Sequence, residues 1–229
     1  MTTTTFDFGD GPVPAHRHRN PDGTEGGWVA DTATVADTVY VGPDALVYGQ
    51  AQVLGLSQVQ DKARVGDLAV IKGKAKIYGE AEVCGQAQVR GKAEVFDQAR
   101  LFGEASAHGR AQVCDQVRVS GRANIYGQSK VRDKAHVYGL TSVYEQAQIG
   151  GEAFVYGLTK VHGRAKVYGQ ARVYGEAQIS DKAHVCGWVH VSDCARVFGQ
   201  AQVGGEAQIR GKAKVGGCSV ISGRTILEV

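Results

Sequence analysis

A six-residue repeat runs through most of this chain. Stepping by six from Val29 to Leu227, the position holds Val or Ile throughout, apart from Leu101, Ala107 and Leu227. A small residue, usually Ala, stands two positions before each aliphatic, and Gly or Asp stands two positions after it. The repeat therefore reads A-x-V-x-[G/D]-x, with no insertion or deletion, and few folds can accommodate it.

Each repeat predicts one short strand and one corner. Ala and Val two positions apart point to the same side of an extended segment, and Gly or Asp tolerates the positive φ of a tight turn. A strand that carries one Val cannot bury a core alone, so successive turns of the chain must stack. We expect an all-β fold, a triangular, single-stranded parallel β-helix with roughly 18 residues per coil. About eleven coils would form a prism on the order of 50 Å long at the usual strand spacing.

The unbroken repeat leaves no place for a linker, so we expect one elongated solenoid over residues 28–229. Residues 1–27 do not keep the repeat and are predicted to form an N-terminal cap, because the end of a solenoid exposes unpaired strand edges. Phe6, Phe8 and Trp28 are the candidates to cover the first coil.

Two further terminal features carry expectations. His16 and His18 form an H-x-H, but with no third ligand nearby we interpret them as part of a solvated basic loop. The repeat continues to Leu227, which predicts a final coil that is either blunted by Arg224 and Glu228 or meets a partner.

Composition narrows the class of protein. The formal charge of +3 is too near balance to indicate a nucleic-acid partner by itself. No apolar run approaches membrane-spanning length and the start lacks the features of a secretory signal, so we expect a soluble, cytoplasmic protein without membrane contact. The five cysteines are odd in number and include no C-x-x-C, which favours neither a disulfide framework nor a zinc knuckle.

The hexapeptide pattern resembles that of the left-handed parallel β-helix superfamily of hexapeptide-repeat proteins. Its motif places a small residue four positions after an aliphatic, as in the pairs Val83 and Ala87, Val89 and Ala93, and Ile149 and Ala153. The resemblance covers about residues 28–229 and implies left-handed winding, which the spacing alone does not show. The segment from Gly23 to Val29 is also similar to the entry segment of a small bacterial, acyltransferase-like subgroup without catalytic loops.

The resemblance implies two kinds of enzyme. Acyltransferases of the superfamily are trimers that use a His as general base and bind coenzyme A between subunits, inside walls built from inserted loops. This repeat contains no such loop, so a pocket that orients substrate and excludes water could arise only between subunits. The repeat-region histidines all occupy outward positions: His108, His136, His162, His184 and His190. The γ-class carbonic anhydrases hold zinc with three His, but no close H-x4-H pair occurs here. We predict no catalytic residue, no metal and no cofactor.

Sorting the outward positions by coil places basic and aromatic residues side by side on one face, whereas the other two faces are mixed. Arg beside Tyr is typical of protein interfaces and of polyanion-binding surfaces, although stacked aromatic residues also support one another along a sheet. The predicted binding face, called the Arg/Tyr face below, consists of Arg64, Arg100, Phe102, Arg118, His136, Tyr138, Tyr156, Arg172, Tyr174 and His190.

These observations favour a non-catalytic β-solenoid scaffold or interaction protein that acts through the Arg/Tyr face as a homo-oligomer, with an acidic partner as another possibility. Two alternatives stay open. A coenzyme A-dependent acyltransferase with a site between subunits would be stabilised by acetyl coenzyme A. A phosphate- or nucleic-acid-binding surface would be retained on heparin in a salt-sensitive way, and less so when Arg100, Arg118 and Arg172 are changed together.

Overall fold

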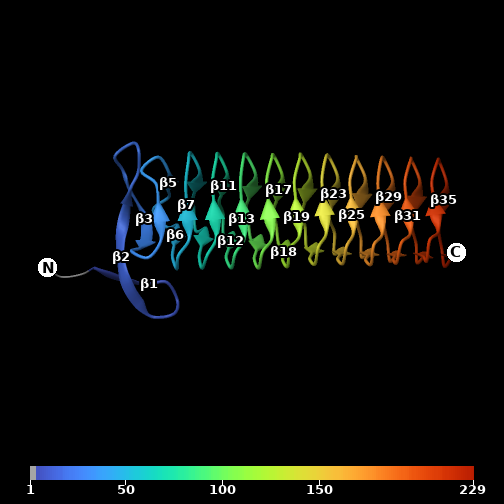
Figure 1. The fold of residues 1–229 in the computed structure, drawn as a ribbon, viewed down its shortest axis with the longest axis horizontal. Helices are drawn as coiled ribbons and strands as arrows, with labels where there is room; N and C mark the ends of the chain where they lie inside the picture. Colours follow the sequence, from blue (N-terminus) through green and yellow to red (C-terminus); the bar gives the residue numbers. More distant parts are fainter. Residues whose placement is uncertain (1–3) are drawn as a thin grey trace.

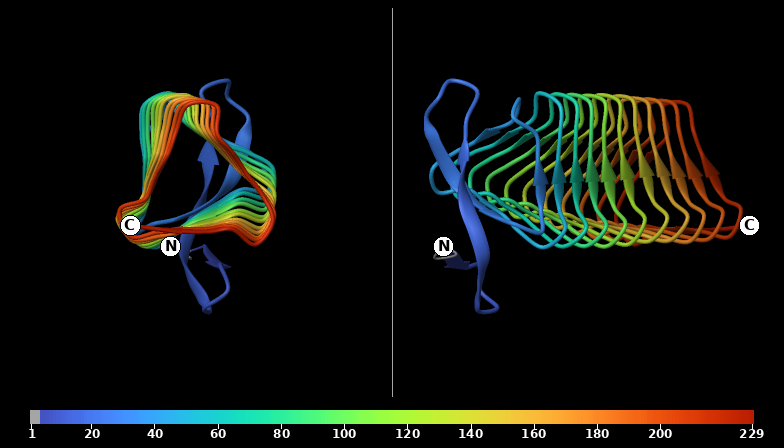
Figure 2. Two further views of the ribbon diagram at one scale, coloured as in Figure 1. Left: turned by 90° about the vertical axis from the view of Figure 1, so that its right-hand side faces the viewer. Right: turned by 60° about the vertical axis from the view of Figure 1, so that its left-hand side comes forward.

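The computed structural model describes residues 4–229 and shows a parallel β-solenoid with no helix among them. Successive coils stack into a long prism with a triangular outline (Figures 1 and 2). Each coil contributes one strand to each of three sheets, and these strands have two or three residues from β4 onward. Partners in neighbouring coils are 18 residues apart, as in Val83 with Leu101. The predicted fold class is confirmed.

The longest sheet, called the long sheet, has 14 strands. Its strands are β1 (Thr5–Asp7), β2 (Pro12–Arg19), β3 (Glu25–Ala30), β6 (Leu46–Val47), β9 (Arg64–Val65), β12 (Glu82–Val83), β15 (Arg100–Leu101), β18 (Arg118–Val119), β21 (His136–Val137), β24 (Phe154–Val155), β27 (Arg172–Val173), β30 (His190–Val191), β33 (Gln208–Arg210) and β36 (Ile226–Glu228).

The other two sheets have 11 strands each. The β4 sheet contains β4 (Thr34–Val35), β7 (Gln52–Val53), β10 (Val70–Ile71), β13 (Gln88–Val89), β16 (Ser106–Ala107), β19 (Asn124–Ile125), β22 (Ser142–Val143), β25 (Lys160–Val161), β28 (Gln178–Ile179), β31 (Arg196–Val197) and β34 (Lys214–Val215). The β5 sheet contains β5 (Tyr40–Val41), β8 (Gln58–Val59), β11 (Lys76–Ile77), β14 (Glu94–Val95), β17 (Gln112–Val113), β20 (Lys130–Val131), β23 (Gln148–Ile149), β26 (Lys166–Val167), β29 (His184–Val185), β32 (Gln202–Val203) and β35 (Val220–Ile221).

The interior is filled by the aliphatic and small residues of the repeat. From Ala45 to Ile209 the inward aliphatics and alanines are fully buried or nearly so. The two exceptions inside the repeat, Leu101 and Ala107, occupy two of the three inward aliphatic positions of one coil and are both fully buried. The larger Leu therefore offsets the smaller Ala within a narrow interior that is packed to high density.

The corners have the conformation that the sequence predicts. From Gly49 onward, the glycines at the corner position have positive φ, and so do the residues that replace them: Asp61, Asp67, Asp97, Asp115, Asp133, Glu145, Asp181 and Asp193. The corner residues of the first coil, Asp31, Asp37 and Pro43, do not. The carboxylate of each positive-φ Asp or Glu accepts a hydrogen bond from the backbone N–H of the corner residue one coil further on. The Asp115 bond from the Asp133 N–H is 2.9 Å long. Asp thus tolerates the left-handed conformation and also ties neighbouring coils together.

The N-terminal segment forms two antiparallel pairs, β1 with β2 and β2 with β3, at one end of the prism (Figures 1 and 2). His16 and His18 lie in β2, so the expected solvated loop is wrong. The buried Asn20 side chain accepts from the Val41 N–H at 2.8 Å and donates to the Val41 carbonyl at 3.1 Å. His18 Nε2 bonds the Val39 carbonyl at 3.0 Å. Because β5 is the end strand of its sheet, no preceding strand pairs with it. The side chains of His18 and Asn20 supply hydrogen bonds to the backbone groups of Val39 and Val41 instead.

The aromatic residues of the N-terminal segment pack on the outside of the first coils of the long sheet. Phe6 stacks on Trp28 at 4.7 Å between ring centroids, and Phe8 stacks on Tyr48 at 5.6 Å. They form a small cluster separate from the main core. Phe6, Phe8 and Trp28 therefore cover the outer surface of the first coils.

The final described coil is held by ion pairs to its neighbour. Arg224 Nε lies 2.8 Å from Glu206, and Arg210 Nε lies 2.9 Å from Glu228. The five cysteines are all free thiols.

Candidate binding face

The structure brings the ten residues of the Arg/Tyr face together on the outer surface of the long sheet. One column follows the first residue of each strand, with parallel pairing of Arg100 to Arg118, Arg118 to His136 and Arg172 to His190. Phe102, Tyr138, Tyr156 and Tyr174 lie two residues further along their coils, in the adjacent column. Ten residues spread over more than a hundred positions in the sequence thus share one surface.

The arginines of this face differ in their contacts. Arg64 donates to the carbonyl of Phe8 at 2.5 Å and lies over the Tyr48 ring, so the N-terminal segment already occupies it. Arg100 Nε lies 3.5 Å from Glu82. Among residues 4–229, Arg118 and Arg172 form no ion pair, and both are exposed. The positive charge available to an external partner is therefore smaller than the column of arginines suggests.

Tyr138, Tyr156 and Tyr174 stack in a ladder. Their ring centroids are 4.9 and 5.2 Å apart, and the rings are within 6° of parallel. Partial burial in this stack, followed by the neighbouring phenols, raises the pKa of Tyr156 above its ordinary value. Because the ring faces cover one another, the ladder presents ring edges and hydroxyls to the outside.

A second ladder on the β4 sheet shows that stacking alone does not mark a site. There His108, Tyr126, Tyr144 and His162 stack at 5.0, 5.0 and 4.8 Å. The two ladders have the same ring spacing because both follow the distance between parallel strands. The aromatic ladder is thus a structural consequence of the repeat, as the sequence analysis allowed.

Two exposed leucines occupy neighbouring positions along one edge of the long sheet. Leu140 (52% exposed) and Leu158 (49%) follow its corner glycines in adjacent coils and lie beside the tyrosine ladder. We call Tyr138, Leu140, Tyr156, Leu158 and Tyr174 the Tyr–Leu patch. Neither leucine was among the predicted site residues, although Leu departs from the polar residues that usually follow the corner position. Contiguous exposed apolar surface is typical of binding surfaces.

A shallow hollow of about 210 Å³ adjoins this patch. It is lined by Tyr138, Phe154, Tyr156 and Arg172, and the Arg172 guanidinium lies 5.9 Å from the centre of the Phe154 ring. Phe154 is the first residue of β24, between His136 and Arg172 in the same column, and its ring forms a wall of this hollow. Aromatic and Arg side chains around a small depression are the residue types enriched at interface hot spots.

The repeat-region histidines do not converge. His136 and His190 lie on the long sheet, His108 and His162 on the β4 sheet, and His184 on the β5 sheet. His136 stacks on Phe154 at 4.8 Å, and burial, followed by the Arg118 charge, lowers its pKa below the ordinary value. An imidazole in such surroundings stays neutral at physiological pH.

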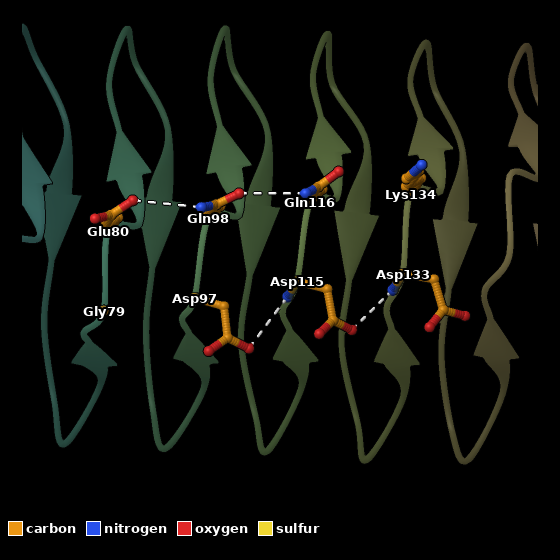
Figure 3. Close-up of a pocket in the computed structure, with 8 residues that line it drawn as sticks. All are labelled: Gly79, Glu80, Asp97, Gln98, Asp115, Gln116, Asp133 and Lys134. Atoms are coloured by element: carbon orange, nitrogen blue, oxygen red, sulfur yellow. Dashed lines mark hydrogen bonds between the residues drawn. The ribbon is translucent and has the colours of Figure 1, made fainter.

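An acidic row lies in the corner that leads into the long sheet, beside a hollow of about 590 Å³ (Figure 3). Asp97, Cys114 and Asp115 place possible metal-ligand atoms within 4.8 Å of one another. However, Oδ2 of Asp97 and Oδ2 of Asp115 each accept a backbone N–H from the next coil. Burial, then the Asp115 charge, raises the pKa of the Cys114 thiol to about 12. The contacts therefore assign these groups to holding the coils together, with the thiol protonated.

Comparison with known proteins adds no identification: no protein family pattern matches the chain, and no curated protein matches it either. Within the described part of the chain, no helix has the length and apolar character needed to cross a lipid bilayer.

Proposed function

We propose that this protein is a non-catalytic β-solenoid scaffold that associates with copies of itself through the Arg/Tyr face. The observation that carries the proposal is the Tyr–Leu patch, where two half-exposed leucines extend the tyrosine ladder over successive coils. Protein interfaces are enriched in Tyr and Arg and depleted in acidic residues at their centres. The patch has this composition, and Arg118 and Arg172 stand in the adjoining column.

Self-association fits the flat shape of this surface. Neighbouring coils repeat at the strand spacing, so a second copy would present the same spacing of ring edges and leucines. A symmetric pair uses one patch on both subunits, which gives a self-complementary interface from a single surface. Membership of the left-handed β-helix superfamily and a cytoplasmic location are parts of this proposal that depend on the sequence resemblance and composition.

The pattern of ion pairs favours self-association over polyanion binding. The N-terminal segment engages Arg64, and Glu82 engages Arg100. Of the exposed arginines on this face, Arg118 and Arg172 form no ion pair within the described chain. Affinity for a polyanion grows with the number of phosphates neutralised, so two separated cations would support only weak binding.

Sedimentation velocity over a range of protein concentrations tests the proposal. The wild-type chain should form a dimer or higher oligomer, and Leu140→Gln with Leu158→Gln should shift it to monomer. Leu56→Gln is the matched control for each single change, because Leu56 is an exposed corner leucine between β7 and β8, off the long sheet, and its substitution should leave association unchanged. A wild-type chain that stays monomeric at every concentration, or an effect of Leu56→Gln equal to that of Leu140→Gln, would refute the proposal.

A further inference from the structure

Trp188 is the most exposed aromatic side chain among the large apolar residues of the described chain, at 63%. It lies in the corner between β29 and β30, at the edge of the long sheet opposite Leu140 and Leu158. No aromatic ring among residues 4–229 stacks on it. An indole left free on the surface keeps a large apolar face in contact with water, which favours burying it against a ligand.

Two hollows meet at Trp188. The first, of about 260 Å³, is lined by Glu152, Phe154, Gln170, Arg172, Trp188 and His190. The second, of about 410 Å³, is lined by Trp188, His190, Glu206 and Gln208. Along the prism, Glu152 and Glu206 are three coils apart, which is roughly 14 Å at the usual strand spacing. The two hollows together are long enough for an extended occupant of several rings.

Apart from Phe154, the side chains that line the two hollows around the indole end in planar polar groups. Two carboxylates accept hydrogen bonds, two amides both donate and accept, and Arg172 and His190 add donors. Neighbours hold the carboxylates in position, since Gln170 Nε2 donates to Glu152 at 3.1 Å and Arg224 Nε lies 2.8 Å from Glu206. Each carboxylate has further acceptor sites for a ligand hydroxyl. The surface is thus organised before any ligand arrives, which lowers the entropic cost of binding.

This combination matches a carbohydrate better than a protein partner. A pyranose ring has a C–H face that can pack on an indole and a rim of hydroxyls that both donate and accept hydrogen bonds. Interface centres between proteins are depleted in Glu and other charged groups, whereas here Glu206 stands one coil from Trp188 and Glu152 lines the same hollow two coils away. The charges balance, since Glu152 and Glu206 stand against Arg172 and Arg224, and this balance fits a neutral glycan.

We propose that Trp188 and the two hollows beside it form a binding site for a short, neutral oligosaccharide of pyranose units. Trp188 stacks on one sugar ring, and the Glu, Gln, Arg and His side chains on both sides bind the hydroxyls of neighbouring rings. The site shares Arg172 and His190 with the Arg/Tyr face, but Trp188, Gln170 and Glu206 lie at the opposite edge of the long sheet from the Tyr–Leu patch. The proposal goes beyond self-association and does not depend on it.

Tryptophan fluorescence provides a direct test, because the chain has only two tryptophans. Trp28 is stacked on Phe6 at 4.7 Å, so Trp28→Phe keeps that aromatic contact and leaves Trp188 as the single reporter. In this background, the full-length protein is titrated with soluble hexasaccharides of β-1,4-glucose, β-1,4-N-acetylglucosamine, β-1,4-xylose and β-1,4-mannose. At least one should change the emission of Trp188 saturably, with a Kd between micromolar and millimolar.

Binding is then measured by calorimetry for variants that keep both tryptophans or remove one. Trp188→Ala should weaken binding of the responding sugar about tenfold or more, and Gln170→Ala or Glu206→Gln should weaken it severalfold. Leu56→Ala, an exposed apolar truncation at the corner between β7 and β8 and outside both proposed sites, is the control and should leave sugar affinity unchanged. The proposal is overturned if no hexasaccharide binds at millimolar concentration, or if Trp188→Ala leaves the affinity intact.

Discussion

The Leu101–Ala107 pair allows a sharp test of how the core is packed. Both side chains are fully buried and occupy inward positions of the same coil, where nearly all other coils carry Val or Ile. Leu101→Val removes one buried methylene and should cost about 1 kcal/mol. Ala107→Val adds two carbons to a coil that already contains the larger Leu, and should cost about 1–3 kcal/mol through overpacking.

The double variant restores the ordinary Val–Val coil. Its loss of folding free energy should therefore be smaller than the sum of the two single losses by about 1–2 kcal/mol. Solenoids unfold with reduced cooperativity, so amide hydrogen exchange is a better assay than a single unfolding midpoint. The informative amides are Arg100, which donates to the Val117 carbonyl at 2.9 Å, and Ser106, which donates to the Ala123 carbonyl at 2.8 Å.

A distant pair supplies the control for this cycle. Leu101→Val combined with Val203→Ile, an overpacking change several coils away, should give additive effects because the two sites share no neighbours. If the Leu101–Ala107 cycle is also additive within about 0.5 kcal/mol, the two side chains do not compensate each other and the account of the core is wrong.

Three further outcomes follow from single positions. Asp115 has φ 59° and accepts a hydrogen bond from the Asp133 N–H at 2.9 Å. Chemical denaturation should show that Asp115→Ala destabilises the stack by about 2 kcal/mol, and more than Asp115→Gly does. The reverse order would contradict the corner assignment. Burial raises the pKa of Cys84 to about 11 and that of Cys114 to about 12. Iodoacetamide at neutral pH should therefore label the exposed Cys186, Cys194 and Cys218 first, as mass spectrometry would show, and prompt labelling of Cys114 would count against a protonated thiol. Burial and the Arg118 charge lower the pKa of His136, so the imidazole binds a proton more readily in the unfolded chain. The free energy of unfolding should therefore fall as the pH drops below about 6.5. His136→Phe should reduce this fall in denaturation curves recorded at several pH values.

The repeat made the fold predictable because its information is local. Period-two alternation determines which side chains face inward, and the corner residue has to adopt positive φ, as Asp115 and the corner glycines do. Stacking at a constant step then places residues 18 apart side by side, which is why the columns of the Arg/Tyr face were obtained from arithmetic on the sequence alone.

Features that break the repeat were harder to predict. The N-terminal segment has no period, so nothing in its sequence indicated that β2 would pair with β3 or that Asn20 would satisfy the backbone of Val41. The engagement of Arg64 by the Phe8 carbonyl depends on that same segment. Leu140, Leu158 and Trp188 follow corner residues, and a one-dimensional pattern does not show toward which of two adjoining faces such a side chain lies.

The most direct test of the proposed function is hydroxyl-radical footprinting at low and high protein concentration. If the Arg/Tyr face is buried between copies of the chain, oxidation of Tyr138, Leu140, Tyr156 and Leu158 should fall several-fold at high concentration, while oxidation of Tyr126 and Tyr144 on the β4 sheet should stay constant. Equal oxidation of the patch at both concentrations, or stronger protection of the β4 sheet than of the patch, would contradict the account.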